Sequence, residues 1–368
     1  MRPEVQEYST TALYALPFRD RSAPMRSRYL AIASRIAIVC CVSASACSQS
    51  DLTRTVKQWQ PKANHPAIVA FSPDGRRLAV SNVLTKDIRI YSVPNFDLLR
   101  TIGKPGEARA IAFAPDSKVL AAGNGFSRLL ENRNSVRLWD IEKGEVLWEP
   151  PGFIAGTGAE NDVEAVAFDS AGKVLLASLN SVHAKRQCCY LFLIDLEKKS
   201  AKGFGTSLAY SIAFSPIGDR IVSGGFDGIR MWSASGEGPL WEHSIQRGES
   251  PTYPPPVRMV AFSPDGSGLL VSSNGVVTIH NAVDGQQQAT LPIKVKTDRT
   301  LAVYSPNGRY IVVAASDRLF IFDAQSKSLL EESDLPKPAF SISFASNSRM
   351  FAIGTSNGTV VVKEFAGP

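Results

Sequence analysis

Short segments in which apolar and polar residues alternate run along most of the chain. RLAVSN (Arg77–Asn82) and SVRLWDI (Ser135–Ile141) are typical, with β-branched and aromatic residues at every second position. A period of two predicts strands with one buried face, and turn-forming residues such as those of SPDG (Ser72–Gly75) separate the segments. With 23 Pro and 27 Gly spread over the 368 residues, we expect many tight turns and no long helix.

The strands belong to a repeat, because the motif VAFSPDG of Val260–Gly266 returns in variant form along the chain. It occurs unchanged at Val69–Gly75 and as IAFSPIG at Ile212–Gly218. Its aromatic residue recurs at intervals of 42, 55, 46, 48, 42 and 40 residues, at Phe71, Phe113, Phe168, Phe214, Phe262, Tyr304 and Phe344. Such a period, with several strands in each unit, is typical of a β-propeller.

The repeat predicts an all-β fold of seven four-stranded antiparallel blades, each with strands a to d. The seventh unit ends at Pro368, soon after its strand c, and so lacks a strand d. DLTRTV (Asp51–Val56) closely copies DLLRTI (Asp97–Ile102), the strand d of the first unit. We therefore expect the N-terminal strand to complete the last blade and close the ring, in one domain over residues 51–368.

The units resemble WD repeats of the bacterial F-S-P-D-G type, over residues 51–365. The Trp-Asp dipeptide occurs at Trp139-Asp140, and the family's Gly-His dipeptide before strand a is absent. The family's His-centred hydrogen-bond network is therefore not expected. The resemblance implies a protein-binding surface on the face formed by the b–c and d–a connections.

The N-terminal region has the pattern of an export signal. Arginines precede an apolar segment, Ile36–Ala46, that is too short to span a bilayer of about 30 Å, and small residues end it. We predict a signal peptide over residues 1–46. Residues 1–24 fit the pattern poorly and are either an extended n-region or the result of a misassigned start codon, with Met25 the true start.

The segment Ala44–Cys47 resembles a bacterial lipobox, which implies lipidation of Cys47 and a linker over residues 47–50. Ser48 after the cysteine implies sorting to the outer membrane, so the expected location is the periplasm, with a lipid anchor. Cleavage after Ala46 without lipidation, and a cytosolic protein with a chance apolar segment, are the alternatives.

Two further cysteines, Cys188 and Cys189, lie outside this region. In an oxidising compartment they could form a vicinal disulfide; the alternative is a pair of thiols at the start of a strand. No cofactor is expected from them.

Charge gives no indication of nucleic-acid binding. Without residues 1–46, the chain has 34 basic and 31 acidic residues, and its net charge falls from +6 to +3. A nucleic-acid-binding domain usually has a concentrated basic face.

The residue four positions before each aromatic residue of the repeat should begin strand a and point into the mouth of the central channel. These residues are Ala67, Arg109, Glu164, Tyr210, Arg258, Thr300 and Phe340. Arg, Tyr and Phe are common anchors of protein interfaces. Long loops of the second and third units add basic residues at Arg128, Arg133, His183, Lys185 and Arg186, although solvated basic side chains cover many loop surfaces.

Catalytic motifs are weak. Gly354–Gly358 fits G-x-S-x-G, but it lies between two predicted strands and not at a strand-to-helix turn, so a hairpin is expected. The four His, among them His280 within a strand, show no metal-ligand spacing. The sequence favours a non-catalytic, monomeric scaffold that binds a protein partner, without a metal or cofactor. The alternative is a periplasmic enzyme or small-ligand binder, lactonase-like or quinoprotein-like, with its site at the channel mouth.

Overall fold

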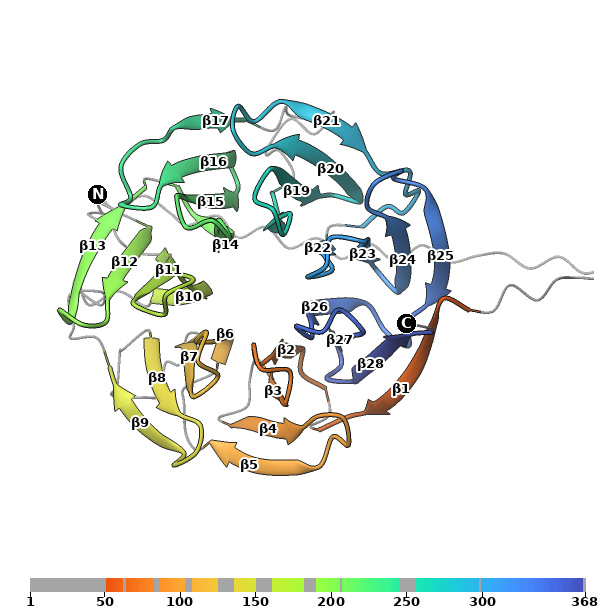
Figure 1. The fold of residues 1–368 in the computed structure, drawn as a ribbon, viewed down its shortest axis with the longest axis horizontal. Helices are drawn as coiled ribbons and strands as arrows, with labels where there is room; N and C mark the ends of the chain where they lie inside the picture. Colours follow the sequence, from red (N-terminus) through yellow and green to blue (C-terminus); the bar gives the residue numbers. More distant parts are fainter. Residues whose placement is uncertain are drawn as a thin grey trace, which may run out of the picture. The chain divides into compact units, whose positions relative to one another are not determined.

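The structure, a computed structural model, describes residues 51–61, 64–82, 87–102, 108–124, 136–149, 161–181, 190–205, 207–244, 256–297 and 299–366. These residues form 28 strands and no helix. The strands pair into seven antiparallel sheets of four, arranged as blades around a central channel (Figure 1). The predicted seven-bladed β-propeller is confirmed.

Strand a of each blade lies innermost and strand d outermost (Figure 1). In blade order, strand a is β2 (Ala67–Phe71), β6 (Ala108–Phe113), β10 (Asn161–Phe168), β14 (Ala209–Phe214), β18 (Met259–Phe262), β22 (Thr300–Tyr304) and β26 (Ala339–Phe344). Strand b is β3 (Arg77–Asn82), β7 (Val119–Asn124), β11 (Val174–Ser181), β15 (Arg220–Gly225), β19 (Gly268–Ser273), β23 (Tyr310–Ala315) and β27 (Met350–Thr355).

The two outer strands of each blade complete the sheets. Strand c is β4 (Ile88–Ser92), β8 (Val136–Asp140), β12 (Leu191–Asp195), β16 (Gly228–Ser233), β20 (Val276–Asn281), β24 (Arg318–Asp323) and β28 (Val360–Phe365). Strand d is β5 (Leu98–Ile102), β9 (Glu145–Trp148), β13 (Ser200–Phe204), β17 (Trp241–His243), β21 (Gln287–Thr290), β25 (Leu329–Asp334) and, in blade 7, β1 (Thr53–Trp59).

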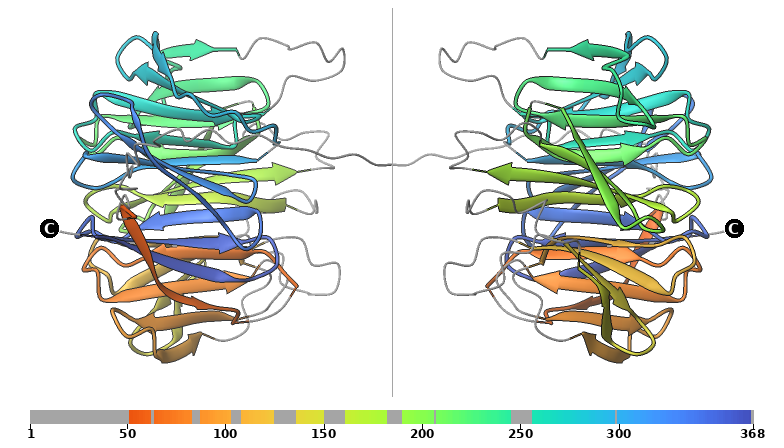
Figure 2. Two further views of the ribbon diagram at one scale, coloured as in Figure 1. Left: turned by 90° about the vertical axis from the view of Figure 1, so that its right-hand side faces the viewer. Right: turned by 90° about the vertical axis from the view of Figure 1, so that its left-hand side faces the viewer.

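The N-terminal strand closes the ring, as the sequence predicted. β1 pairs antiparallel with β28, from Thr53 opposite Phe365 to Trp59 opposite Val360, so blade 7 combines the two ends of the described chain (Figures 1 and 2). Glu331 of β25 in blade 6 accepts hydrogen bonds from the backbone N–H and the hydroxyl of Thr53, both at 2.7 Å. The closing strand is thus tied to β28 of its own blade and to the preceding blade 6.

The SPDG motif is the a–b turn of the blade. In blade 1 the N–H of Gly75 donates to the carbonyl of Ser72 at 2.9 Å, and Gly75 has a φ of +70°, which glycine adopts without a steric cost. Asp74 accepts from the Ser72 hydroxyl at 2.5 Å and from the N–H of Arg76 at 3.0 Å. The motif recurs because each blade needs the same tight connection.

Apolar clusters fill the spaces between neighbouring blades. A large side chain near the end of strand c packs against strand d of the preceding blade, as Tyr91 does on Trp59 (ring centroids 5.2 Å apart) and Trp232 on Phe204 (5.3 Å). Stacking each blade on the next therefore builds one continuous core. Within the part of the chain that the structure describes, no helix is long and apolar enough to cross a membrane.

Candidate functional site

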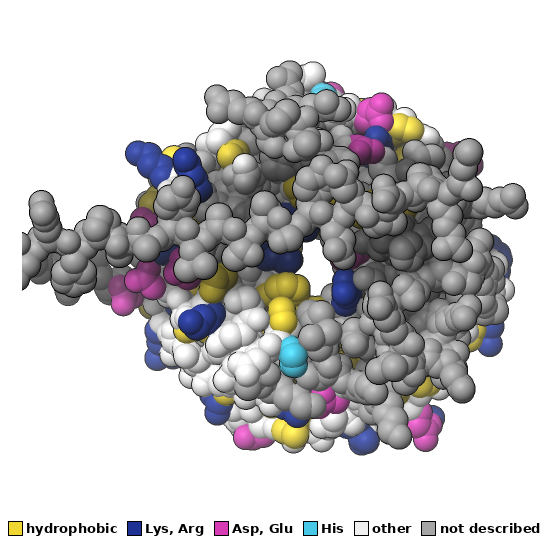
Figure 3. Space-filling model, turned by 180° about the vertical axis from the view of Figure 1, so that it is seen from behind, with side chains coloured by type: hydrophobic (Ala, Val, Ile, Leu, Met, Phe, Trp, Pro, Cys, Tyr) yellow, Lys and Arg dark blue, Asp and Glu magenta, His cyan; other side chains and the backbone are white. Residues whose placement is uncertain are grey.

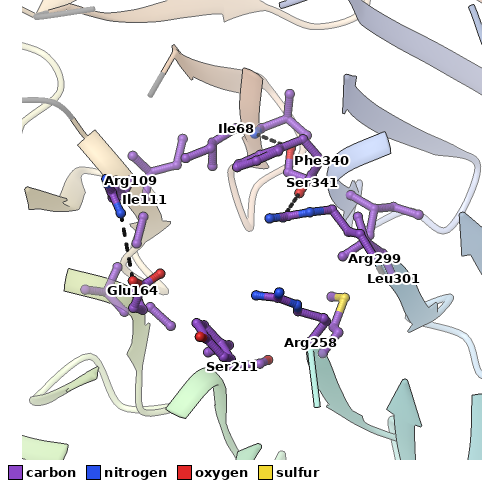
Figure 4. A pocket seen from close by; sticks show the side chains of 17 residues that line it. Ile68, Arg109, Ile111, Glu164, Ser211, Arg258, Arg299, Leu301, Phe340 and Ser341 are labelled. Atoms are coloured by element: carbon purple, nitrogen blue, oxygen red, sulfur yellow. Dashed lines mark hydrogen bonds and ion pairs between the residues drawn. The ribbon is translucent and has the colours of Figure 1, made fainter. Parts of the chain in front are cut away.

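A cavity of about 450 Å³ lies at the start of the strands a, at one mouth of the central channel (Figure 4). All seven blades contribute to its lining, which consists of Ile68, Val69, Arg109, Ala110, Ile111, Glu164, Ala165, Val166, Tyr210, Ser211, Arg258, Met259, Arg299, Leu301, Phe340, Ser341 and Ile342. Because the strands of each blade are antiparallel, the described strand ends that lead into the b–c and d–a connections lie on the same face. Figure 3 looks onto this face and shows basic and apolar side chains around the central opening.

The structure brings five of the sequence-predicted residues together at the mouth. Arg109, Glu164, Tyr210 and Phe340 each lie where the pairing of strand a with strand b shifts register, so each is the extra residue of a β-bulge. Arg258 directly precedes β18, and its N–H donates to the carbonyl of Ser272 at 2.9 Å. Bulges commonly redirect a side chain out of the regular alternation, and here they aim four side chains at the channel.

The prediction was wrong for Ala67 and Thr300, which are fully buried and do not line the cavity. Strand a of blades 1 and 6 pairs with strand b without a bulge, so the alternation turns these residues into the blade. The Thr300 hydroxyl accepts from the N–H of Gly275 at 3.0 Å. Ile68 and Arg299 line the mouth instead. Arg299 was missed because it is five, not four, positions before the aromatic residue.

The charged and aromatic side chains of the mouth form three pairs, each across two neighbouring blades. Nη1 of Arg109 in blade 2 lies 3.9 Å from Oε1 of Glu164 in blade 3. The guanidinium of Arg258 in blade 5 stacks over the ring of Tyr210 in blade 4, 4.6 Å from its centroid. The first two pairs therefore join blades 2 to 3 and 4 to 5.

The third pair joins blades 6 and 7. The Arg299 guanidinium lies 4.1 Å from the centroid of the Phe340 ring, and its Nη1 donates to the Phe340 carbonyl at 3.5 Å. Cation–π contacts of this kind hold a charged group in place without neutralising it. Figure 4 shows Arg258 and Arg299 extending into the same space.

The mouth carries a net positive charge, because three Arg and one Glu are the charged residues of its lining. Nε of Arg258 is buried and has no hydrogen-bond acceptor within the described residues. Burial raises the pKa of the Tyr210 phenol, and the negative charge of Glu164 acts in the same direction against the lowering effect of Arg258. Tyr210 is therefore a neutral phenol at pH 7, able to donate a hydrogen bond.

Several sequence-predicted residues lie outside the described residues. These are Cys47 of the expected lipid anchor, the possible disulfide pair Cys188 and Cys189, and the basic residues Arg128, Arg133, His183, Lys185 and Arg186. The roles given to them stay predictions.

The described residues contain no group of three or more His, Cys, Asp and Glu side chains placed to hold a metal ion. The G-x-S-x-G segment Gly354–Gly358 forms the b–c hairpin between β27 and β28, where the N–H of Thr355 donates to the carbonyl of Thr359 at 2.9 Å. Ser356 is therefore in a hairpin, as the sequence predicted, and not in a nucleophile elbow.

Comparison with known proteins adds a partial similarity. The SAGA complex subunit Spt8 of Schizosaccharomyces pombe is 32% identical to this chain over 97 residues, which is 24% of this chain and 18% of that protein. The chain thus spans less than a fifth of the length of this relative. No model of a known protein family matches the chain.

Proposed function

We propose that this chain is a non-catalytic propeller that binds a protein partner on the face of the b–c and d–a connections, centred on the channel mouth. The observation that carries the proposal is the set of three inter-blade pairs, which presents Arg, Tyr and Phe side chains around one opening. These residue types dominate the energetics of protein interfaces, and two aromatic rings hold two of the arginines in position. The similarity to a subunit of a multiprotein complex supports the same conclusion.

The charge of the mouth favours a partner segment of opposite sign. Three Arg and one Glu attract acidic side chains, which would also provide the acceptor that Nε of Arg258 lacks within the described residues. A partner loop or terminus with a carboxylate at its tip fits an opening of about 450 Å³.

We also propose that the protein is anchored by a lipid in the periplasm. The apolar segment Ile36–Ala46 followed by Cys47 supports export and lipidation at the periplasmic side of the outer membrane. A lipid anchor on the N-terminal side of β1 would hold a monomeric propeller at the membrane while its mouth binds the partner.

Photo-crosslinking in cells tests the proposal. A crosslinker is placed at Arg258 in the mouth and, as a control, at Lys173, whose side chain is 62% exposed beside the a–b turn of blade 3 on the opposite face. We expect one discrete protein adduct from Arg258 and none from Lys173. Absence of a protein adduct from both sites, or the same adducts from both, would contradict the scaffold. In that case a metal or quinone that copurifies would favour the enzyme or small-ligand alternative.

A further inference from the structure

A second cavity, of about 540 Å³, lies between blades 4 and 5, away from the channel mouth. Its lining includes Val276, Thr278 and His280, alternate residues of β20 in blade 5. His243, the last residue of β17 in blade 4, and Gln287 of β21 also line it. None of these residues belongs to the site described above.

The cavity exists because blade 5 differs from the other blades at two positions of strand c. At the position of His280, four other blades carry an aromatic side chain: Tyr91, Trp139, Trp232 and Phe322. Blade 3 has Ile194 there and blade 7 has Lys363. The aromatic side chains are buried at the contact with the preceding blade. The apolar cluster between blades 4 and 5 includes neither His280 nor His243.

The second position lies two residues earlier, at Thr278. Blades 1, 2 and 4 have Arg there. Arg137 pairs with Glu149, directly after β9, and Nε of Arg230 lies 2.9 Å from Oε2 of Glu242 in β17. The short Thr278 side chain leaves that space open. A strand d of only three residues in blade 4 covers little of it.

The hydrogen bonds of His280 define the polar character of the cavity. Nδ1 of His280 is 2.9 Å from the carbonyl oxygen of Gly285, so it must donate, and Nε2 is 2.8 Å from Oγ1 of Thr278, so it accepts in the neutral ring. Burial lowers the pKa of His280, which keeps the ring neutral. Among the described residues, no Asp, Glu, Lys or Arg lines the cavity.

We propose that the cavity between blades 4 and 5 binds a small uncharged polyhydroxyl ligand, a mono- or disaccharide. The hydroxyls of Thr278 and Ser273 donate to His280 Nε2 and to the Pro256 carbonyl, so each can accept from a sugar hydroxyl, and the Gln287 amide can both donate and accept. Ile229 and Val276, the latter 46% exposed, provide apolar contact for the C–H face of a ring. The volume is in the range of small-molecule sites, and an ionic ligand would lose its hydration here without an opposite charge.

The test is a titration of the full chain with maltose, cellobiose, lactose and N,N′-diacetylchitobiose, followed by the methyl signals of Ile229, Val271 and Val276. We expect saturable shifts for at least one sugar, with a Kd of about 1 mM or lower. Glucuronate should bind more weakly than methyl glucoside. No saturable shift with any of the four sugars, or tighter binding of glucuronate, would overturn the proposal.

The double variant Thr278→Arg with Thr290→Glu is designed to fill the cavity with an Arg–Glu pair like that of Arg230 and Glu242 in blade 4. Thr290 lies directly opposite Thr278, as Glu242 lies opposite Arg230, so the pair should fold as it does in blade 4. We expect sugar affinity to fall at least about tenfold. Arg258→Ala, at the mouth, is the control that should leave it unchanged. If the double variant does not fold, Val276→Phe fills the same space; binding that survives either filled cavity refutes the site.

Discussion

Several polar contacts join the two ends of the ring. Among single substitutions in these contacts, removal of the Glu331 carboxylate should destabilise the protein most. Glu331 accepts from the N–H and hydroxyl of Thr53, from Nζ of Lys363 at 3.3 Å and from the hydroxyl of Ser333 at 3.2 Å. The side chains of Glu331 and Lys363 are each only 9% exposed. The carboxylate therefore links blade 6 to both β1 and β28 of blade 7.

The magnitude follows from what each substitution leaves behind. Glu331→Ala leaves the Lys363 ammonium buried with Ser333, at 3.1 Å, as its described partner, and removes the acceptor of two Thr53 donors. Breaking a buried ion pair in this way costs about 3–5 kcal/mol of the free energy of unfolding. Lys363→Met leaves Glu331 with three donors, so we expect a smaller loss of about 1–2 kcal/mol.

Urea unfolding of both single variants and the double variant measures these costs and their coupling. The control is Arg54→Ala on the same strand, where the pair with Glu364 has an arginine side chain 73% exposed; it should cost no more than about 0.5 kcal/mol. Hydrogen exchange at Thr53 should accelerate in Glu331→Ala and not in Arg54→Ala. Equal losses for Glu331→Ala and Lys363→Met, or a loss below about 1 kcal/mol for the first, would refute the reasoning.

Three further predictions follow from the closure, the N-terminus and His280. Deletion of residues 51–58 removes most of the strand that pairs with β28 and should lower the melting temperature by at least about 10 °C; an unchanged value contradicts the closure. Cys47→Ser should release the protein from the membrane fraction, and a variant that stays membrane-bound is incompatible with the lipid anchor. Burial lowers the pKa of His280 from 6.5, so the unfolded state binds more protons as the pH falls below 6.5. The contribution of His280 to the free energy of unfolding should be fully present above pH 6.5 and should be lost as the pH falls below it. Urea unfolding at several pH values should show this dependence, and His280→Gln should flatten it.

The fold could be predicted because each blade repeats the same local chemistry. The SPDG turn, the alternation of each strand and the copy of Asp97–Ile102 at Asp51–Val56 are all visible in the sequence. The structure extends the closing strand to Trp59, which packs on Tyr91 and was not part of the prediction. Interactions within one repeat or between adjacent repeats determine such a fold, so a single sequence contains most of the information.

The mouth could be predicted only in part, because its composition depends on backbone register. Counting four residues back from the aromatic residue finds the right side chain where strand a has a bulge, as at Arg109 and Phe340. The count fails at Thr300, where strand a has no bulge and Arg299 lines the mouth instead. A bulge adds one residue without a residue type that marks it, so the sequence alone does not reveal which blades contain one.

The position of His280 and Lys363 in strand c shows how one place in the repeat can serve several purposes. An aromatic side chain there, as in Trp139 or Phe322, fills the contact with the preceding blade and contributes only to packing. Lys363 replaces that filling with an ion pair to Glu331, at the one blade contact that the two ends of the propeller must complete. His280 replaces it with a hydrogen-bonded neutral ring and leaves a cavity of about 540 Å³. Apolar packing is the cheaper way to join two blades, since buried polar groups need partners. A polar residue at this position therefore indicates a blade contact with a task beyond packing, which is ring closure in blade 7 and, by our proposal, ligand binding in blade 5.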